Sequence, residues 1–333
     1  MTIVVKIKIV VKNKLINNQY RLQYKISFVY KKKEMSLKKE AIVILGGGSA
    51  KGLAHIGALE IIEKHYEIKG IIGTSMGSII GGLYAAGKSP TEIKKIFKGY
   101  KLLDYLSIIS FPFPHNGFVS SQKFEEMIFE KIGNIHIEDL KIPFVAVAYN
   151  LSKHQTVLIN KGKLKFAMQA SSSIPIVFSP FKSEGDFFID GGIEYPLAVP
   201  FKNIFGDYFS IAVNVLQPIP IVPVFHEIKE KDKSKFFEEN NLKEGLKSIT
   251  DNQAFLASKS ATVYQPDILI NAHLPNVNSW EFMKVDEFYE RGKYAAQKTF
   301  DKLKTENKSF TNLLTEKYEQ LKEKIGKIKI KYP

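Results

Sequence analysis

Short apolar runs alternate along this chain with stretches in which apolar residues recur at helical spacing. Residues 41–45 form an uncharged apolar run, which is typical of a strand buried on both faces. A second run at 70–72 predicts another strand, followed by a tight turn and a helix that ends near Ala86 with Gly87 as its C-cap. Between the two runs, one apolar helical face is formed by Leu53, Ile56, Leu59 and Ile62.

The same alternation continues towards the C-terminus. Ser89, Pro90 and Glu92 form a capping box with proline at the first helical position, which predicts a helix start. Further strands are predicted at 142–149, 156–159, 187–189, 210–215 and 267–270, and a helix at 163–171. Alternating strands and helices predict an α/β fold, a three-layer sandwich around a mostly parallel central sheet.

Charge divides the chain unevenly. Residues 1–34 hold a net charge of +8, from eight lysines and Arg21 against Glu34, out of +14 for the 333-residue chain. The basic character therefore belongs mostly to an N-terminal extension, residues 1–38, and the rest gives no reason to expect nucleic acid as a partner. Residues 216–333 are expected to complete the fold as a largely helical segment, with a charged loop or helix at 227–246 and a Lys/Glu-rich helical tail at 282–331.

The N-terminal extension has two open interpretations. Met35 is the expected natural start, which makes the preceding residues a gene-prediction artefact or a disordered basic arm. The alternative is a membrane-surface tether, because each basic residue near an anionic bilayer contributes about 1 kcal/mol. Alternating apolar and basic residues at 5–9 fit a strand with one apolar face. No apolar run of signal-peptide length occurs there, so no secretory signal is expected.

Composition removes several classes of protein. The chain has no cysteine, which excludes a disulfide scaffold, a thiolate metal site and a cysteine nucleophile. We expect a cytoplasmic protein that is able to contact a membrane peripherally. The best candidate for a membrane span is the uncharged stretch at residues 70–87. It contains six glycines, so a turn within a globular fold explains it better than a membrane span.

Residues 46–52 form a glycine-rich loop between a buried strand and a helix. Such a loop points backbone N–H groups at an anion. The Walker pattern fails because Lys51 precedes Gly52, and the dinucleotide pattern fails because its glycine spacing is absent. An oxyanion hole and a plain tight turn remain open.

Residues 73–77 read Gly-Thr-Ser-Met-Gly between a strand and a helix, the setting of a nucleophile elbow. Ser75 is the candidate nucleophile, and side chains at Gly73 or Gly77 are expected to collide with neighbouring backbone. Asp190, followed by Gly191 and Gly192, ends a predicted strand and is the candidate base, although Asp-Gly is also a common turn.

A histidine-based triad is the alternative to direct proton transfer between serine and aspartate. Only His226 and His273 follow Asp190 in the chain, and His273, at the end of a strand, is the better candidate. His55 is expected to be a packed or exposed helix residue.

Taken together, the three ordered motifs resemble those of the patatin-like phospholipase family. The similarity covers about residues 39–215, a patatin-like catalytic domain, and more loosely the tail to residue 292. The resemblance implies a serine acyl-ester hydrolase of phospholipase or lysophospholipase type, with a Ser75–Asp190 dyad, a lipid acyl-ester substrate, no catalytic histidine, no cofactor and no metal. We expect the oxyanion donors to be the N–H groups of Gly47, Gly48 and Ser49. The remaining motif residues are Gly46, Lys51, Gly52, Gly73, Gly77, Gly191 and Gly192.

Three residues depart from the family pattern: Ser49 replaces a glycine, Lys51 an arginine and Tyr195 an asparagine. The apolar, proline-containing segments 108–114 and 174–178 either line an acyl channel, rest on a membrane or pack in the core. Two other functions stay open, a catalytically idle lipid-binding or regulatory protein and a serine protease. Oligomeric state and head-group preference are not indicated.

Overall fold

The computed structural model describes residues 6–16, 19–29, 39–99, 132–175, 177–219, 241–273, 275, 277 and 281–326. It divides the chain into two compact units, residues 1–38 and 39–333. The first unit contains an antiparallel hairpin of β1 (Lys6–Ile16) and β2 (Gln19–Val29), so the strand predicted from alternation is confirmed. Met35 lies outside the described residues.

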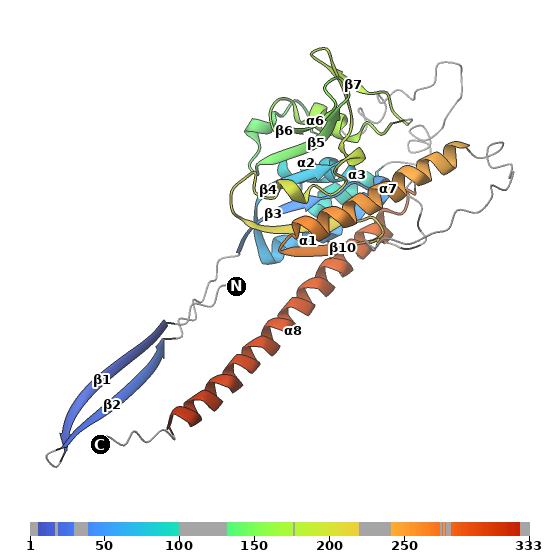
Figure 1. Cartoon of the computed structure of the whole chain (residues 1–333). Coiled ribbons are helices and arrows are strands. Elements are labelled where there is room, and N and C mark those ends of the chain that lie inside the picture. Colours follow the sequence, from blue (N-terminus) through green and yellow to red (C-terminus); the bar gives the residue numbers. More distant parts are fainter. Residues whose placement is uncertain are drawn as a thin grey trace, which may run out of the picture. The chain divides into compact units, whose positions relative to one another are not determined.

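The second unit is built on an eight-stranded sheet in the order β10-β9-β3-β4-β5-β8-β7, with β6 beside β5 (Figure 1). Its strands are β3 (Lys39–Leu45), β4 (Tyr66–Thr74), β5 (Phe144–Asn150), β6 (Gln155–Ile159), β7 (Phe181–Ser183), β8 (Asp186–Asp190), β9 (Phe209–Asn214) and β10 (Ile268–Asn271). The pairs from β10 to β5 are parallel, whereas β6, β7 and β8 pair antiparallel.

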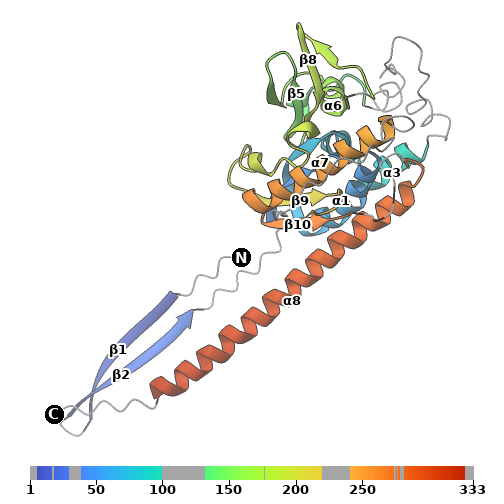
Figure 2. The same ribbon diagram turned by 45° about the vertical axis from the view of Figure 1, so that its right-hand side comes forward.

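Helices cover both faces of this sheet. They are α1 (Ala54–His65), α2 (Met76–Ala85), α3 (Pro90–Lys98), α6 (Leu164–Ser172), α7 (Asn241–Tyr264) and α8 (Val285–Gly326). Side chains of α1, α2, α3, α6 and α8 share one core, and those of α7 contribute to a second core on the other face. Figure 2 shows α7 in front of the sheet and α8 on the side of α1. The mixed α/β, layered fold is therefore confirmed.

Strand β3 shows why the apolar run is continuous. Ala41, Val43 and Leu45 point into the first core, and Ile42 and Ile44 into the second. Neither face meets water, so neither face requires polar residues.

Two helix ends allow a direct comparison with the predictions. The capping box at Ser89 is confirmed, because its hydroxyl accepts from the N–H of Glu92 while the Glu92 carboxylate accepts from the N–H of Ser89. The predicted C-cap of α2 is wrong by one residue: Ala86 is the cap, and Gly87 follows it with φ +91°, the left-handed conformation that glycine adopts without strain. Residues 108–114 and 227–240 lie outside the described residues.

Sheet register brings the three motifs to one place. The glycine loop follows β3 and Ser75 follows β4, and these parallel strands end side by side. Val147 of β5 pairs with Thr74, while the next residue, Ala148, pairs with Asp190 on the antiparallel strand β8. Ser75 and Asp190 therefore flank the same point of β5, although 115 positions separate them in the chain.

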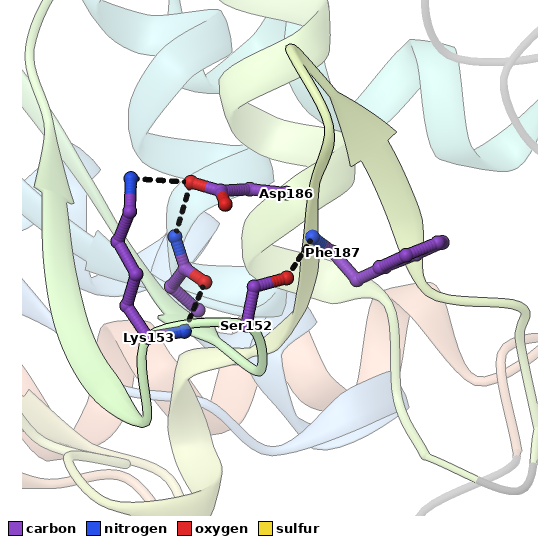
Figure 3. Close-up of polar contacts among 5 residues, drawn as sticks. Ser152, Lys153, Asp186 and Phe187 are labelled. Atoms are coloured by element: carbon purple, nitrogen blue, oxygen red, sulfur yellow. Dashed lines mark hydrogen bonds and ion pairs between the residues drawn. The ribbon is translucent and has the colours of Figure 1, made fainter.

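A polar clamp at the start of β8 supports this register (Figure 3). Asp186 Oδ2 accepts from Asn150 Nδ2 at 2.9 Å and from Lys153 Nζ at 2.6 Å. The N–H of Phe187 donates to Ser152 Oγ at 3.1 Å. The clamp fixes the far end of β8 against the β5–β6 turn, which leaves Asp190 level with the serine turn.

Candidate active site

Ser75 occupies the sharp turn between β4 and α2. Its φ of 55° and ψ of −125° are sparsely populated by L-residues, as expected for a strained nucleophile elbow. A Cβ on Gly73 would lie 2.5 Å from the Cα of Ser78, and one on Gly77 would lie 2.6 Å from the carbonyl oxygen of Gly46. The predicted collisions are confirmed: Gly73 allows the turn to fold tightly on itself, and Gly77 allows it to approach the end of β3.

The backbone of Ser75 is fully engaged. Its carbonyl accepts from the N–H groups of Ser78 and Ile79 in the first turn of α2. Its N–H donates to Ser171 Oγ at 3.0 Å, and this hydroxyl donates to the carbonyl of Val147 at 2.6 Å. Ser171 on α6 therefore fixes the turn against β5. No role for Ser171 was predicted, although a run of three serines at a helix end indicates polar contacts to backbone.

Asp190 is a buried carboxylate with an incomplete set of partners. The residue is 1% exposed, and Oδ1 accepts from the N–H of Gly192 at 2.6 Å. Oδ2 has no hydrogen-bond partner among the residues that the structure describes. The pKa of Asp190 is raised to about 6, because the effect of burial is larger than the opposite effects of the Ser75 hydroxyl and the Gly192 N–H.

The hydroxyl of Ser75 is therefore near Asp190, but their contact falls short of a formed hydrogen bond. Catalytic hydrogen bonds are often long before substrate binds, so this geometry is compatible with proton transfer. Gly191 explains how the carboxylate comes so close, since a Cβ there would overlap the carbonyl of Val147.

The glycine loop offers two donors instead of three. The N–H of Gly47 donates to the carbonyl of Pro196 at 2.7 Å, so the expectation that Gly47 contributes to an oxyanion hole is wrong for this structure. The N–H groups of Gly48 and Ser49 have no acceptor among the described residues. Ser49 has φ 51°, so the chain changes direction here, where the family pattern has glycine.

The segment after Asp190 joins the other two motifs through its backbone. Thr74 Oγ1 donates to the carbonyl of Tyr195 at 3.0 Å, next to the Pro196 carbonyl that accepts from Gly47. The side chain of Tyr195 packs edge-on against Phe201 with ring centroids 5.0 Å apart. Thr74 contacts the main-chain oxygen of residue 195 and not its side chain. This hydrogen bond to the serine turn is therefore kept although tyrosine stands where the family pattern has asparagine.

Two titratable residues belong to this region: Lys51 lies within the glycine loop, and His273 lies close enough to feel its charge. Lys51 is half-buried, which lowers the pKa of its ammonium group, while the charge of Asp251 acts in the opposite direction. Burial and the positive charges of Lys51 and Arg291 lower the pKa of His273. Asp190 is not among the groups that act on His273, nor His273 among those that act on Asp190. The triad alternative gains no support from this arrangement.

Neither a metal-binding cluster nor a membrane-spanning helix is found among the described residues. No three His, Asp or Glu side chains gather there in a way that would hold a metal ion. Of the helices in the same part of the chain, none combines the length and apolar character of a bilayer-spanning segment.

The chain is similar to several known proteins. Residues 43–201, which include all three motifs, match the patatin-like phospholipase family model. An uncharacterized NTE family protein of Mycobacterium bovis is 35% identical over 173 residues, 51% of this chain and 48% of that protein. Lysophospholipase NTE1 of Coccidioides immitis is 32% identical over 181 residues, 53% of this chain and 12% of that protein. The matched region thus spans half or less of these relatives.

A crystal structure of VipD from Legionella pneumophila is similar with a TM-score of 0.40 and 13% identity, covering 87% of this chain and 70% of that one. The family assignment rests on the sequence match and on the order of the three motifs. Residues 43–201, just under half of the chain, therefore form a patatin-like phospholipase domain.

Proposed function

We propose that this chain hydrolyses acyl esters of lipids, with Ser75 as nucleophile and Asp190 as general base. One observation carries the proposal: a buried carboxylate, one oxygen of which has no hydrogen-bond partner among the described residues, lies beside a serine held in strained backbone geometry. The family match and the lysophospholipase names among the relatives support the lipid class of substrate.

The proposed reaction has two halves. In the first, Asp190 Oδ2 takes the proton of Ser75 Oγ as that oxygen bonds to the ester carbonyl carbon, and the carbonyl electrons move onto its oxygen. When this tetrahedral intermediate collapses, the alcohol leaves with the proton from Asp190, and an acyl-serine remains. In the second, water gives a proton to Asp190 while attacking the acyl carbon. Cleavage of the acyl–Oγ bond releases the fatty acid and returns the proton to Ser75.

Electrostatics favour this sequence in two ways. The N–H groups of Gly48 and Ser49 are the donors proposed for the oxyanion, and one such donor contributes about 3 kcal/mol in acyl-transfer enzymes. Ser75 precedes the N-terminus of α2, where the helix dipole stabilises negative charge. A pKa of about 6 for Asp190 leaves it ionised at neutral pH and makes it a stronger base than an exposed aspartate.

A substrate screen tests the proposal. Purified protein is assayed on short esters, lysophospholipids, phospholipids, triacylglycerols and a peptide amide, with the Ser75→Ala protein as blank. We expect hydrolysis of lipid esters that the blank lacks. Preferential amide cleavage would instead indicate a protease, and lipid binding without turnover of any ester would indicate an idle lipid-binding protein.

We also propose peripheral membrane contact through an aromatic–lysine surface that includes both faces of the β7–β8 hairpin. Phe166 and Phe181, with Lys163 and Lys165, lie on one face. Phe187 and Lys182, which pair across the strands, lie on the other face. Phe166 and Phe187 are each 42% exposed, and the Phe166 and Phe181 rings lie 5.7 Å apart. The ammonium groups of Lys163 and Lys165 lie 5.5 and 5.2 Å from the ring centroid of Phe166. That of Lys182 lies 5.5 Å from the ring centroid of Phe187. Aromatic rings favour the bilayer interface, and lysines favour anionic lipid.

Replacing both Phe166 and Phe187 by serine is expected to weaken binding to phosphatidylserine-containing vesicles at least tenfold, because two partly exposed rings no longer enter the interface. Vesicle co-sedimentation measures the change. The matched control is Tyr294→Ser, which removes an exposed ring that also lies near cations. Equal losses in the control and the double variant would contradict the proposed surface. Hydrolysis of a soluble short-chain ester is expected to stay unchanged in both.

A further inference from the structure

His55 is a buried imidazole directly behind the glycine loop. It lies in the first turn of α1, is 0% exposed, and its Nε2 is 2.7 Å from the carbonyl oxygen of Gly46. A carbonyl oxygen can only accept, so Nε2 carries the proton and donates. Nδ1 then holds a lone pair and has no partner among the described residues. The sequence predicted only a packed or exposed histidine here.

With this hydrogen bond, both polar groups of the Gly46–Gly47 peptide are held in place. The carbonyl of Gly46 accepts from His55, and the N–H of Gly47, at the other end of the same peptide, donates to Pro196 at 2.7 Å. The N–H of Gly46 donates to Val213 of β9 at 3.1 Å. Three hydrogen bonds, from α1, from β9 and from the loop at Pro196, therefore hold the chain immediately before the two N–H groups that have no acceptor among the described residues.

The orientation of a peptide determines where the next N–H groups point, because only φ and ψ are free between planar units. The Gly46–Gly47 peptide immediately precedes the peptide that carries the N–H of Gly48, and the N–H of Ser49 follows one unit later. Pro196 and Val213 fix N–H groups only. Among the described residues, His55 is the side chain that fixes the carbonyl end.

We infer that His55 is a positioning residue, which orients the N–H groups of Gly48 and Ser49 toward the substrate oxyanion without touching substrate. This inference rests on the proposed function. Burial lowers the pKa of His55 to about 4, which keeps the ring neutral and matches the single donor that the geometry requires.

Two amide substitutions separate positioning from simple packing. Glutamine places an N–H group at about the position of Nε2, whereas asparagine places one near Nδ1, out of reach of Gly46. We expect His55→Gln to retain at least a third of the wild-type kcat and His55→Asn to lose at least tenfold, with little change in KM for a soluble short-chain ester. The loss arises because misdirected donors stabilise the negative oxygen of the transition state less than correctly placed ones do. Binding of the uncharged ester depends little on these donors, so KM changes little.

The rate at which a fluorophosphonate probe modifies Ser75 is expected to follow the same order, because the phosphoryl oxygen of the adduct needs the same donors. Rates are referred to the folded fraction measured by circular dichroism. Equal losses in the two variants, or none in either, would overturn the inference.

A measurement on the unmutated chain covers the case in which a variant does not fold. Nitrogen-15 spectra of the histidine side chains at pH 7.5 are expected to show His55 as the Nε2–H tautomer, with its proton shielded from exchange. A fast-exchanging or Nδ1–H imidazole would overturn the inference even in an inactive protein. If the wild-type chain is not modified by the probe and hydrolyses no ester, while His55 shows the expected tautomer, the proposed function fails and the hydrogen bond to the loop stands.

Discussion

Replacing Ser75 by alanine is expected to lower kcat for ester hydrolysis by roughly 10⁴-fold or more, the size of effect seen when a serine hydrolase loses its nucleophile. Without Oγ no acyl-serine forms, and attack by water depends on the remaining donors alone. The same change is expected to abolish modification by a fluorophosphonate probe, measured by mass spectrometry of the intact chain. Removing one hydroxyl from a turn held by its backbone should change thermal stability little.

Ser172→Ala is the matched control for this experiment. Ser172 is also a buried serine near the elbow, but its hydroxyl bonds to the carbonyl of Met168 within its own helix. We expect its activity and probe modification to remain within a factor of two of wild type. Ester hydrolysis that survives in Ser75→Ala and disappears in Ser172→Ala would reject the assignment of the nucleophile.

Replacing Asp190 by asparagine is expected to change activity and stability in opposite directions. The rate should fall by roughly 10³-fold, because the amide cannot accept the serine proton. Stability at pH 8 should rise by up to about 3 kcal/mol, because the pKa of Asp190 is raised from 3.8 to about 6 and each pKa unit corresponds to about 1.4 kcal/mol. The amide keeps Oδ1 for the N–H of Gly192. Chemical denaturation and ester kinetics measure the two effects.

The pH dependence of both effects follows from the same shift. Between about pH 4 and pH 6 the folded chain keeps the proton on Asp190 while the unfolded chain releases it, so wild-type stability falls as pH rises through this window. The stabilisation by asparagine should therefore vanish near pH 4 and be complete above pH 6. The wild-type kcat/KM should rise through pH 6 and then level off, since the base acts in its ionised form.

His273→Ala provides the control for the base. We expect this variant to keep activity within a factor of three, because Asp190 and His273 do not act on one another in the structure. A loss of several hundredfold, together with a near-normal rate in Asp190→Asn, would favour a histidine base. An unchanged stability of Asp190→Asn at pH 8 would contradict the raised pKa.

Much of the fold was predictable because its signals are local. The run at 41–45 has apolar residues on both sides of the strand, and the structure places them in two cores. The capping box at Ser89 involves residues only three positions apart. Gly73 of the serine turn was predicted for the same reason, since the space available to it is limited by Ser78 of the same turn, whereas the space available to Gly77 is limited by Leu45 and Gly46.

Which N–H groups of the glycine loop stay without an internal acceptor was predicted less well, and the reason is distance along the chain. Gly47 was expected to donate to substrate, but its N–H is taken by Pro196, almost 150 residues later. His55 and Ser171 were not assigned to the site. Their hydrogen-bond partners are the carbonyl of Gly46 and the N–H of Ser75, and such backbone groups leave no residue-specific signal in the sequence.

The sequence by itself determined which residues we propose as nucleophile and base, because a serine in a glycine-bounded strand–helix turn and an aspartate before two glycines have few other uses in combination. Tertiary structure alone decided how they meet. The antiparallel entry of β8 beside β5 sets Asp190 level with the serine turn, and burial there raises its pKa. The position and the pKa of a carboxylate depend on which groups surround it and how much water they exclude. Neither can be read from the residues next to it in the sequence.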